Sequence, residues 1–202
     1  MCNGCKEFVL KTSLPKHRRT CIRNERSFAI DLPMLKKEIP HELSEAFKKH
    51  ILATLRNDEV GLKCKDDHAV LLFGIRLYDK VKRCQNIIGA TRDVRSKMRM
   101  LVHLYIHFMN QKPTKLCFES AKDMFHSNNF EALKKAITSY TSSDEEEIKA
   151  GLKNNLQFVL IKAAKIFKGQ ALTDSRKEEA MIFEDFLGVL ELWKVNFICY
   201  KT

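Results

Sequence analysis

The chain has 202 residues, of which 45% are hydrophobic and 30% charged, and its formal net charge is +11. A chain of this length and composition can bury a core, which excludes a wholly disordered or collagen-like protein. No apolar run reaches the ~18 residues of a membrane span, and no secretory signal follows the first residue, so we expect an intracellular protein without a membrane partner.

The positive charge is unevenly distributed. Lys and Arg outnumber Asp and Glu by 9 to 4 in residues 1–40 and by 14 to 8 in residues 41–112, whereas residues 113–202 carry 13 of each. A basic part joined to a balanced part predicts one surface that faces a polyanion, of which nucleic acid is the commonest, and one that serves as scaffold. The alternative is a basic protein whose charge has no such role.

The first 21 residues carry a metal-ligand pattern, Cys-x2-Cys-x11-His-x3-Cys, formed by Cys2, Cys5, His17 and Cys21. Two Cys separated by two residues reach one metal from a tight turn, and a His and Cys four apart share one face of a helical turn. The pattern predicts a Zn²⁺ site in a small module, residues 1–21, that resembles a strand-strand-helix zinc finger with Cys in place of the last His. The alternative is an N-terminus with three unrelated thiols.

The predicted module also has a basic face, formed by Lys16, Arg18, Arg19 and Arg23. Such side chains contact DNA phosphates without reading sequence. The positions from which a finger reads bases hold Leu10, Thr12 and Ser13, which are poor readers, so we expect weak and salt-sensitive binding.

Residues 22–43 contain Pro33 and Pro40 and are predicted to be a linker. Residues 44–202 are then predicted to form one compact all-α domain. Ser44 caps a helix that extends to Leu55, and a second helix starts near Asp66–Asp67.

After a break at Gly89, Thr91 is predicted to cap a third helix that stops before Pro113. Shorter helices are expected near 119–126 and 129–140. A long helix opens at Asp144–Glu147 and ends at Gly169, and a last one spans 174–197. The acidic run at 144–147 is interpreted as compensation of the helix dipole.

The third helix carries Arg92, Arg95 and Arg99 at positions that share one face. This arrangement predicts either a ridge that contacts phosphates or the solvated face of an amphipathic helix. On the same helix, His103 and His107 lie four apart among large apolar residues and lack the Glu of an HExxH site, so we expect packed or edge histidines rather than metal ligands.

Several residues are assigned to the core by spacing and type. We expect Leu101 and Phe158 to be buried, together with the helix-spaced aromatic residues and with four dispersed cysteines that act as small apolar side chains. The aromatic residues are Phe183, Phe186, Trp193 and Phe197. The cysteines are Cys64, Cys84, Cys117 and Cys199.

Three segments, DDHAVLLFGIRLYDK (66–80), SKMRMLVHLYIHF (96–108) and KAAKIFKGQAL (162–172), occur in this order before Trp193. They resemble the N-terminal region of animal proteins of mobile-element ancestry, in which a finger fragment and a helical block precede a domain similar to the tyrosine recombinases of Crypton-type elements. The signature consists of Asp67, Gly74, Met98, Arg99 and residues 168–172. The resemblance implies that the helical block clamps DNA by its backbone.

Recombinase chemistry needs an Arg, a His-x-x-Arg pair and a nucleophilic Tyr, and no His of this chain has Arg three residues later. The sequence therefore predicts a truncated, noncatalytic copy that binds DNA in the nucleus. No motif predicts a small-molecule substrate or another enzyme. The alternative is a protein-interaction scaffold that uses the balanced helical half.

Overall fold

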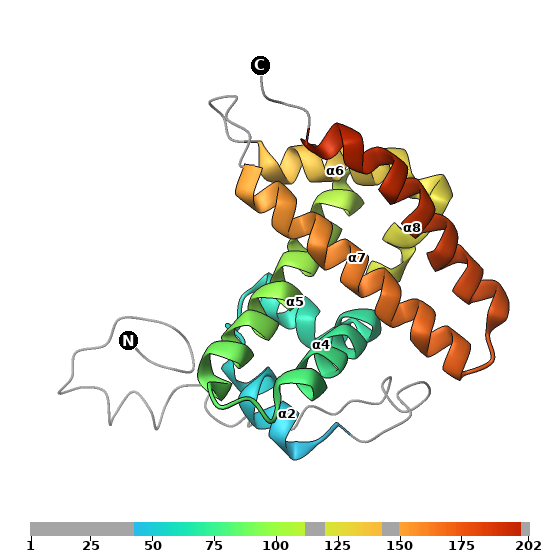
Figure 1. Cartoon of the computed structure of the whole chain (residues 1–202). Helices are drawn as coiled ribbons and strands as arrows, with labels where there is room; N and C mark the ends of the chain where they lie inside the picture. The colour runs from blue at the N-terminus through green and yellow to red at the C-terminus, as the bar shows by residue number, and fades with distance from the viewer. Residues whose placement is uncertain (1–42, 112–119, 143–149, 199–202) are drawn as a thin grey trace, which may run out of the picture. The chain divides into compact units, whose positions relative to one another are not determined.

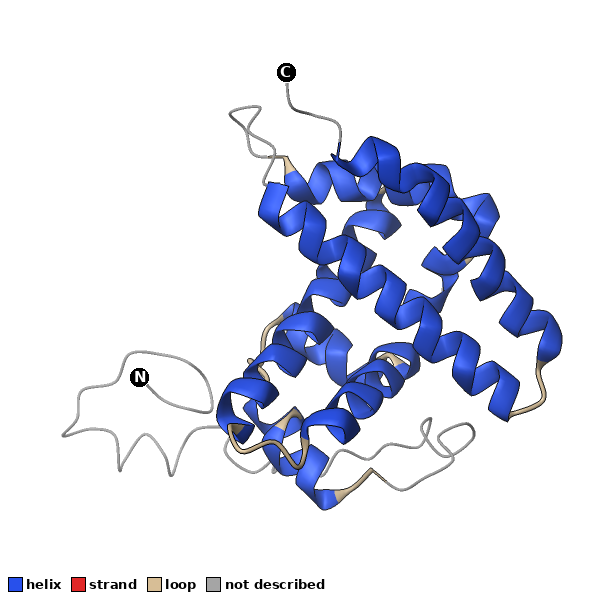
Figure 2. Cartoon of the chain, viewed as in Figure 1, coloured by secondary structure: helices blue, strands red, loops and turns tan. Residues whose placement is uncertain are grey.

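Seven α-helices and three short 3-10 helices make up the part of the chain that the structure describes (Figures 1 and 2). The structure, a computed structural model, describes residues 43–111, 120–142 and 150–198. These ranges contain no β-strand, which confirms the all-α prediction for them. The predicted zinc module (1–21) lies outside the described residues, as does the predicted linker (22–43) apart from Leu43.

The α-helices are α2 (Glu45–His50), α3 (Glu59–Asp66), α4 (His68–Val81), α5 (Ile87–Asn110), α6 (Phe130–Thr141), α7 (Ala150–Thr173) and α8 (Lys177–Ile198). The 3-10 helices are η1 (Leu52–Thr54), η2 (Ala121–Phe125) and η3 (Ser127–Asn129).

Side-chain caps fix where the first helices begin. Ser44 caps α2, Asp58 caps α3 and Asp67 caps α4, each by accepting a hydrogen bond from an amide of the first turn. The predicted starts at Ser44 and near Asp67 are confirmed, although α2 ends at His50 and only the 3-10 turn η1 continues toward Leu55. Helix α3 was not predicted.

The predicted start of α5 at Thr91 is wrong, because the helix begins at Ile87 with Asn86 as its cap. The Gly89 amide donates to Asn86 Oδ1 at 3.0 Å, and a Cβ on Gly89 would lie 2.9 Å from Asn86 Nδ2. Gly89 therefore gives room to the capping side chain inside the first turn and does not break the chain. Thr91 is buried one turn later.

The predicted end of α7 at Gly169 is also wrong, because the helix continues to Thr173. It ends in a Schellman arrangement, in which the Arg176 amide donates to Ala171 O at 2.8 Å and the Ser175 amide to Leu172 O at 3.1 Å. Ser175 takes the left-handed conformation there, with φ of 59°. The start of α7 lies beside residues 143–149, outside the described part of the chain.

Helix α7 occupies the middle of the helical arrangement. It forms an antiparallel hairpin with α8 and also packs against α4, α5 and α6 (Figure 1). An aromatic cluster lies between α7, α8 and η2, where the Phe125 ring contacts Phe167, Phe183 and Phe186 at centroid distances of 5.3, 6.1 and 4.9 Å. Trp193 is half-buried and stands edge-on to Phe130.

Phe183 and Phe186 are buried as predicted, and so is Leu101. The prediction for Phe158 is wrong, because 70% of this residue is exposed. The buried residues of α7 follow one side of the helix around Leu160 and Phe167, and Phe158 lies on the opposite side. The Phe197 side chain lies outside the described part.

Candidate nucleic-acid interface

Each predicted metal ligand, Cys2, Cys5, His17 and Cys21, lies outside the described residues, as do the basic residues Lys16, Arg18 and Arg19. Within the described ranges no group of three or more His, Cys, Asp or Glu side chains could hold a metal ion. No helix in these ranges is long and apolar enough to cross a membrane.

The described cysteines differ in environment. Cys64 is buried as predicted, and burial raises the pKa of its thiol to about 12. Cys84 is exposed, so its predicted burial is wrong. It follows the end of α4, in the turn before α5.

Arg99 is held by an ion pair within the domain. Its Nη1 and Nη2 donate to Asp58 Oδ1 and Oδ2 at 2.8 and 2.7 Å. Asp58 Oδ1 also accepts from the Gly61 amide at 2.7 Å, so one carboxylate both caps α3 and fixes α3 to α5. The hydrogen bond from Arg99, together with the Gly61 amide and the nearby guanidinium charge, keeps the pKa of Asp58 well below its usual value although desolvation opposes the shift.

The other two predicted arginines have different surroundings. Arg95 is half-buried and donates to the Thr54 hydroxyl, whereas Arg92 is exposed near the start of α5. The predicted shared face of α5 therefore exists, but two of its three guanidinium groups bind residues of another segment, Thr54 of η1 and the α3 cap Asp58. Two of the five N–H donors of Arg99 are therefore committed to Asp58.

His103 and His107 pack against one ring. Both stack on Tyr140 of α6, at centroid distances of 5.6 and 5.1 Å, and His107 Nδ1 lies 3.1 Å from Ser139 Oγ. Burial is the leading reason that the pKa values of both histidines lie below their usual value. The prediction of packed, edge histidines is confirmed.

A group of lysines on the other flank of α5 was missed by the sequence analysis. Lys80 of α4 and Lys97 of α5 lie close enough to Lys162 of α7 to interact with it electrostatically. Partial burial and repulsion by these two ammonium groups lower the pKa of Lys162, and Asp93 opposes the shift. Asp93 itself forms an ion pair with Lys97.

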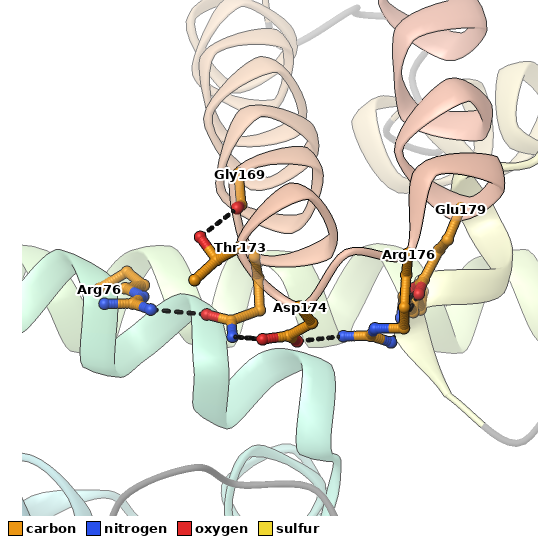
Figure 3. A network of polar contacts seen from close by, with 8 residues as sticks. Arg76, Gly169, Thr173, Asp174, Arg176 and Glu179 are labelled. Atoms are coloured by element: carbon orange, nitrogen blue, oxygen red, sulfur yellow. Dashed lines mark hydrogen bonds and ion pairs between the residues drawn. The ribbon is translucent and has the colours of Figure 1, made fainter.

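A polar network fixes the relative position of α4 and α7 (Figure 3). Arg76 Nη2 donates to Gln170 Oε1 at 2.6 Å, and Gln170 Nε2 donates to Asp174 at 2.9 Å. Arg176 Nη2 donates to the other side of Asp174 at 2.6 Å and holds the start of α8 to the end of α7. Lys80 lies one turn beyond Arg76 on α4.

A charge signal for this lysine group was present in the sequence. Residues 148–173 contain five Lys and no Asp or Glu, between acidic residues at 144–147 and 174–191. Because residues 113–202 carry 13 basic and 13 acidic residues in total, the net charge of this range is zero and hides the basic segment. The convergence of Lys80 and Lys97 on α7 required the tertiary structure.

Comparisons with protein-family models, curated protein sequences and solved structures found no match to this chain.

Proposed function

We propose that the helical domain binds the phosphate backbone of DNA weakly, with little sequence preference and without catalysing a reaction. The observation that carries this proposal is that Lys80, Lys97 and Lys162 lie on α4, α5 and α7, three helices that pack against one another. The acid that acts on Lys162 is Asp93, which pairs with Lys97. The like charges of these lysines repel one another, and a bound polyanion would relieve the repulsion while releasing its own counterions.

Other features support the same surface. Helix α7 carries four Lys and no acid, and Lys165 is exposed one turn beyond Lys162. The resemblance to the helical block of mobile-element proteins implies a backbone clamp of this kind. The zinc module, the nuclear location and the mobile-element ancestry remain predictions.

The test is a salt titration of duplex binding. Log affinity should fall linearly with log salt by about 0.9 for each phosphate neutralised. Replacing both Lys80 and Lys162 by Gln should reduce that slope by about 2 and weaken binding equally on unrelated duplexes. The matched control replaces Lys135 and Lys177, which are exposed on α6 and α8, and should leave the slope unchanged.

The rival function is a protein-interaction scaffold, and α8 gives it one specific observation. Met181 and Leu192 are 63% and 80% exposed on the outer side of this helix. If duplex DNA at micromolar protein and ~50 mM salt shows no binding, where phosphate contacts are strongest, the scaffold replaces the proposed function. If the Lys80/Lys162 variant and its control had equal salt slopes, any DNA contact would lie on another part of the protein.

A further inference from the structure

The exposed face of α7 combines an aromatic ring with positive charge. Phe158, Lys162 and Lys165 lie at positions i, i+4 and i+7, and therefore on one side of the helix. From Phe158 to Lys165 this face extends about 10 Å along the axis, at the helical rise of 1.5 Å per residue. No residue of α7 is acidic, so every charged side chain that this helix places beside the Phe158 ring is positive.

Exposed apolar side chains are ordinary when they occur singly. The position of Phe158 distinguishes it from the exposed apolar residues of α8. Met181 and Leu192 share the outer side of α8 with Glu184 and Asp185, whereas Phe158 is one turn from Lys162, which Lys97 and Lys80 approach from α5 and α4. An exposed ring beside several ammonium groups suits a ligand with both flat rings and negative charges.

We propose that this face binds single-stranded nucleic acid, with a base stacked on Phe158 and the neighbouring phosphates on Lys162 and Lys165. A ring on a convex helix cannot reach the face of a base inside an intact duplex, whereas an unpaired base offers its face freely. The inference rests on the proposed function for the phosphate contacts. The inference goes beyond the proposed function because it assigns a preference for single strands over duplex and names an uncharged contact residue, Phe158.

The experiment titrates the full chain against labelled oligo(dT), oligo(rU) and a DNA duplex of equal length and follows fluorescence anisotropy. Phe158→Leu should weaken binding of the single strands by roughly tenfold. Since Phe carries no charge, the salt slope should not change. Duplex binding should also stay the same. Phe158→Trp, which keeps an aromatic ring, should retain or tighten single-strand binding.

Leu192→Ala on α8 is the control for loss of an exposed apolar side chain and should change neither titration. The oligo(dT) and oligo(rU) arms show whether the strand is DNA, RNA or either. Helical circular dichroism of Phe158→Leu should match that of the parent protein, since the ring has little burial to lose.

The inference is overturned if Phe158→Leu leaves single-strand affinity unchanged or weakens duplex and single strands equally. After either result, the proposed function would still stand if duplex binding still depended on Lys80 and Lys162. Absence of all nucleic-acid binding would overturn both proposals. Phe158-dependent binding to phosphatidylserine vesicles, or a Phe158-dependent dimer, without oligonucleotide binding would assign the face to another occupant.

Discussion

Replacing Arg99 by Met tests whether this arginine serves the fold or a ligand. The guanidinium makes two hydrogen bonds to Asp58, and the two side chains are 22% and 43% exposed. Exposed ion pairs contribute about 0.2–1 kcal/mol after solvent screening, and the bidentate geometry places this one near the upper end. We therefore expect Arg99→Met to lower the free energy of unfolding by about 1 kcal/mol.

Substitutions of Asp58, the partner of Arg99, separate the two roles of its carboxylate, which are the ion pair and the α3 cap. Asp58→Asn keeps an oxygen for the Gly61 amide but loses the ion pair, and should also cost about 1 kcal/mol. Asp58→Ala loses the α3 cap as well, which costs about 1 kcal/mol more. Urea unfolding of the single variants and of Arg99→Met/Asp58→Asn gives a double-mutant cycle, in which the coupling should account for most of each single loss.

The pH dependence follows from the lowered pKa of Asp58. A depressed folded-state pKa stabilises the protein above the unfolded value, near pH 4, and this stability is lost as pH falls. The difference between the parent protein and Arg99→Met should therefore narrow below about pH 4. If Arg99→Met left stability unchanged but flattened the salt slope of DNA binding, Arg99 would be a phosphate contact and this reasoning would be refuted.

Three further outcomes are expected. Gly74→Ala places a Cβ 2.5 Å from Sδ of the buried Met98. It should lower the free energy of unfolding in urea by about 1–3 kcal/mol. Gly151→Ala, at an open position, is the control and should not lower it. Ser175→Gly should raise the unfolding free energy by about 1 kcal/mol, since Ser175 has φ of 59°; an unchanged melting temperature would contradict this. Cys5→Ser should abolish binding of about one zinc per chain and keep the helical circular dichroism, and zinc retained by that variant would exclude Cys5 as a ligand.

Local capping signals predicted two helix starts, whereas the equally local caps Asp58 and Asn86 were missed. Ser44 and Asp67 bond to amides two or three residues away, so their roles follow from the adjacent sequence. Gly89 and Gly169 misled the prediction because a glycine was taken as a break. One lies inside a helix beside a bulky cap, and the other lies on an exposed face where it costs the helix little beyond its weak propensity.

Contacts between distant segments could not be predicted in the same way. Arg99 and Asp58 are 41 residues apart, and Arg76 and Gln170 are 94 apart. The burial of Phe158 was misjudged for a related reason. The run LQFVLI at 156–161 is nearly apolar throughout, so periodicity could not decide which side of α7 meets its neighbours.

Several of the residues on which the predicted mobile-element resemblance rests hold the fold. Asp67 caps α4 and also accepts from the Ala121 amide at 2.7 Å, which ties η2 to the α3–α4 junction. Gly74 leaves space for Met98, and Arg99 pairs with Asp58. Lys168 pairs with Glu184 of α8 at 2.9 Å, and Gln170 bridges Arg76 and Asp174.

A resemblance carried by such residues predicts a shared fold more directly than a shared activity. The phosphate contacts that we propose lie at other positions of the same three segments, Lys80, Lys97 and Lys162. Lys97 pairs with Asp93 on its own helix, and none of the three lysines makes a cap or a close packing contact of the kind that Gly74 makes. The two sets can therefore vary independently. Related chains that keep Asp67, Gly74 and Gln170 but replace these lysines would share the helical arrangement without the DNA contact, whereas chains that keep both sets would support a common backbone clamp.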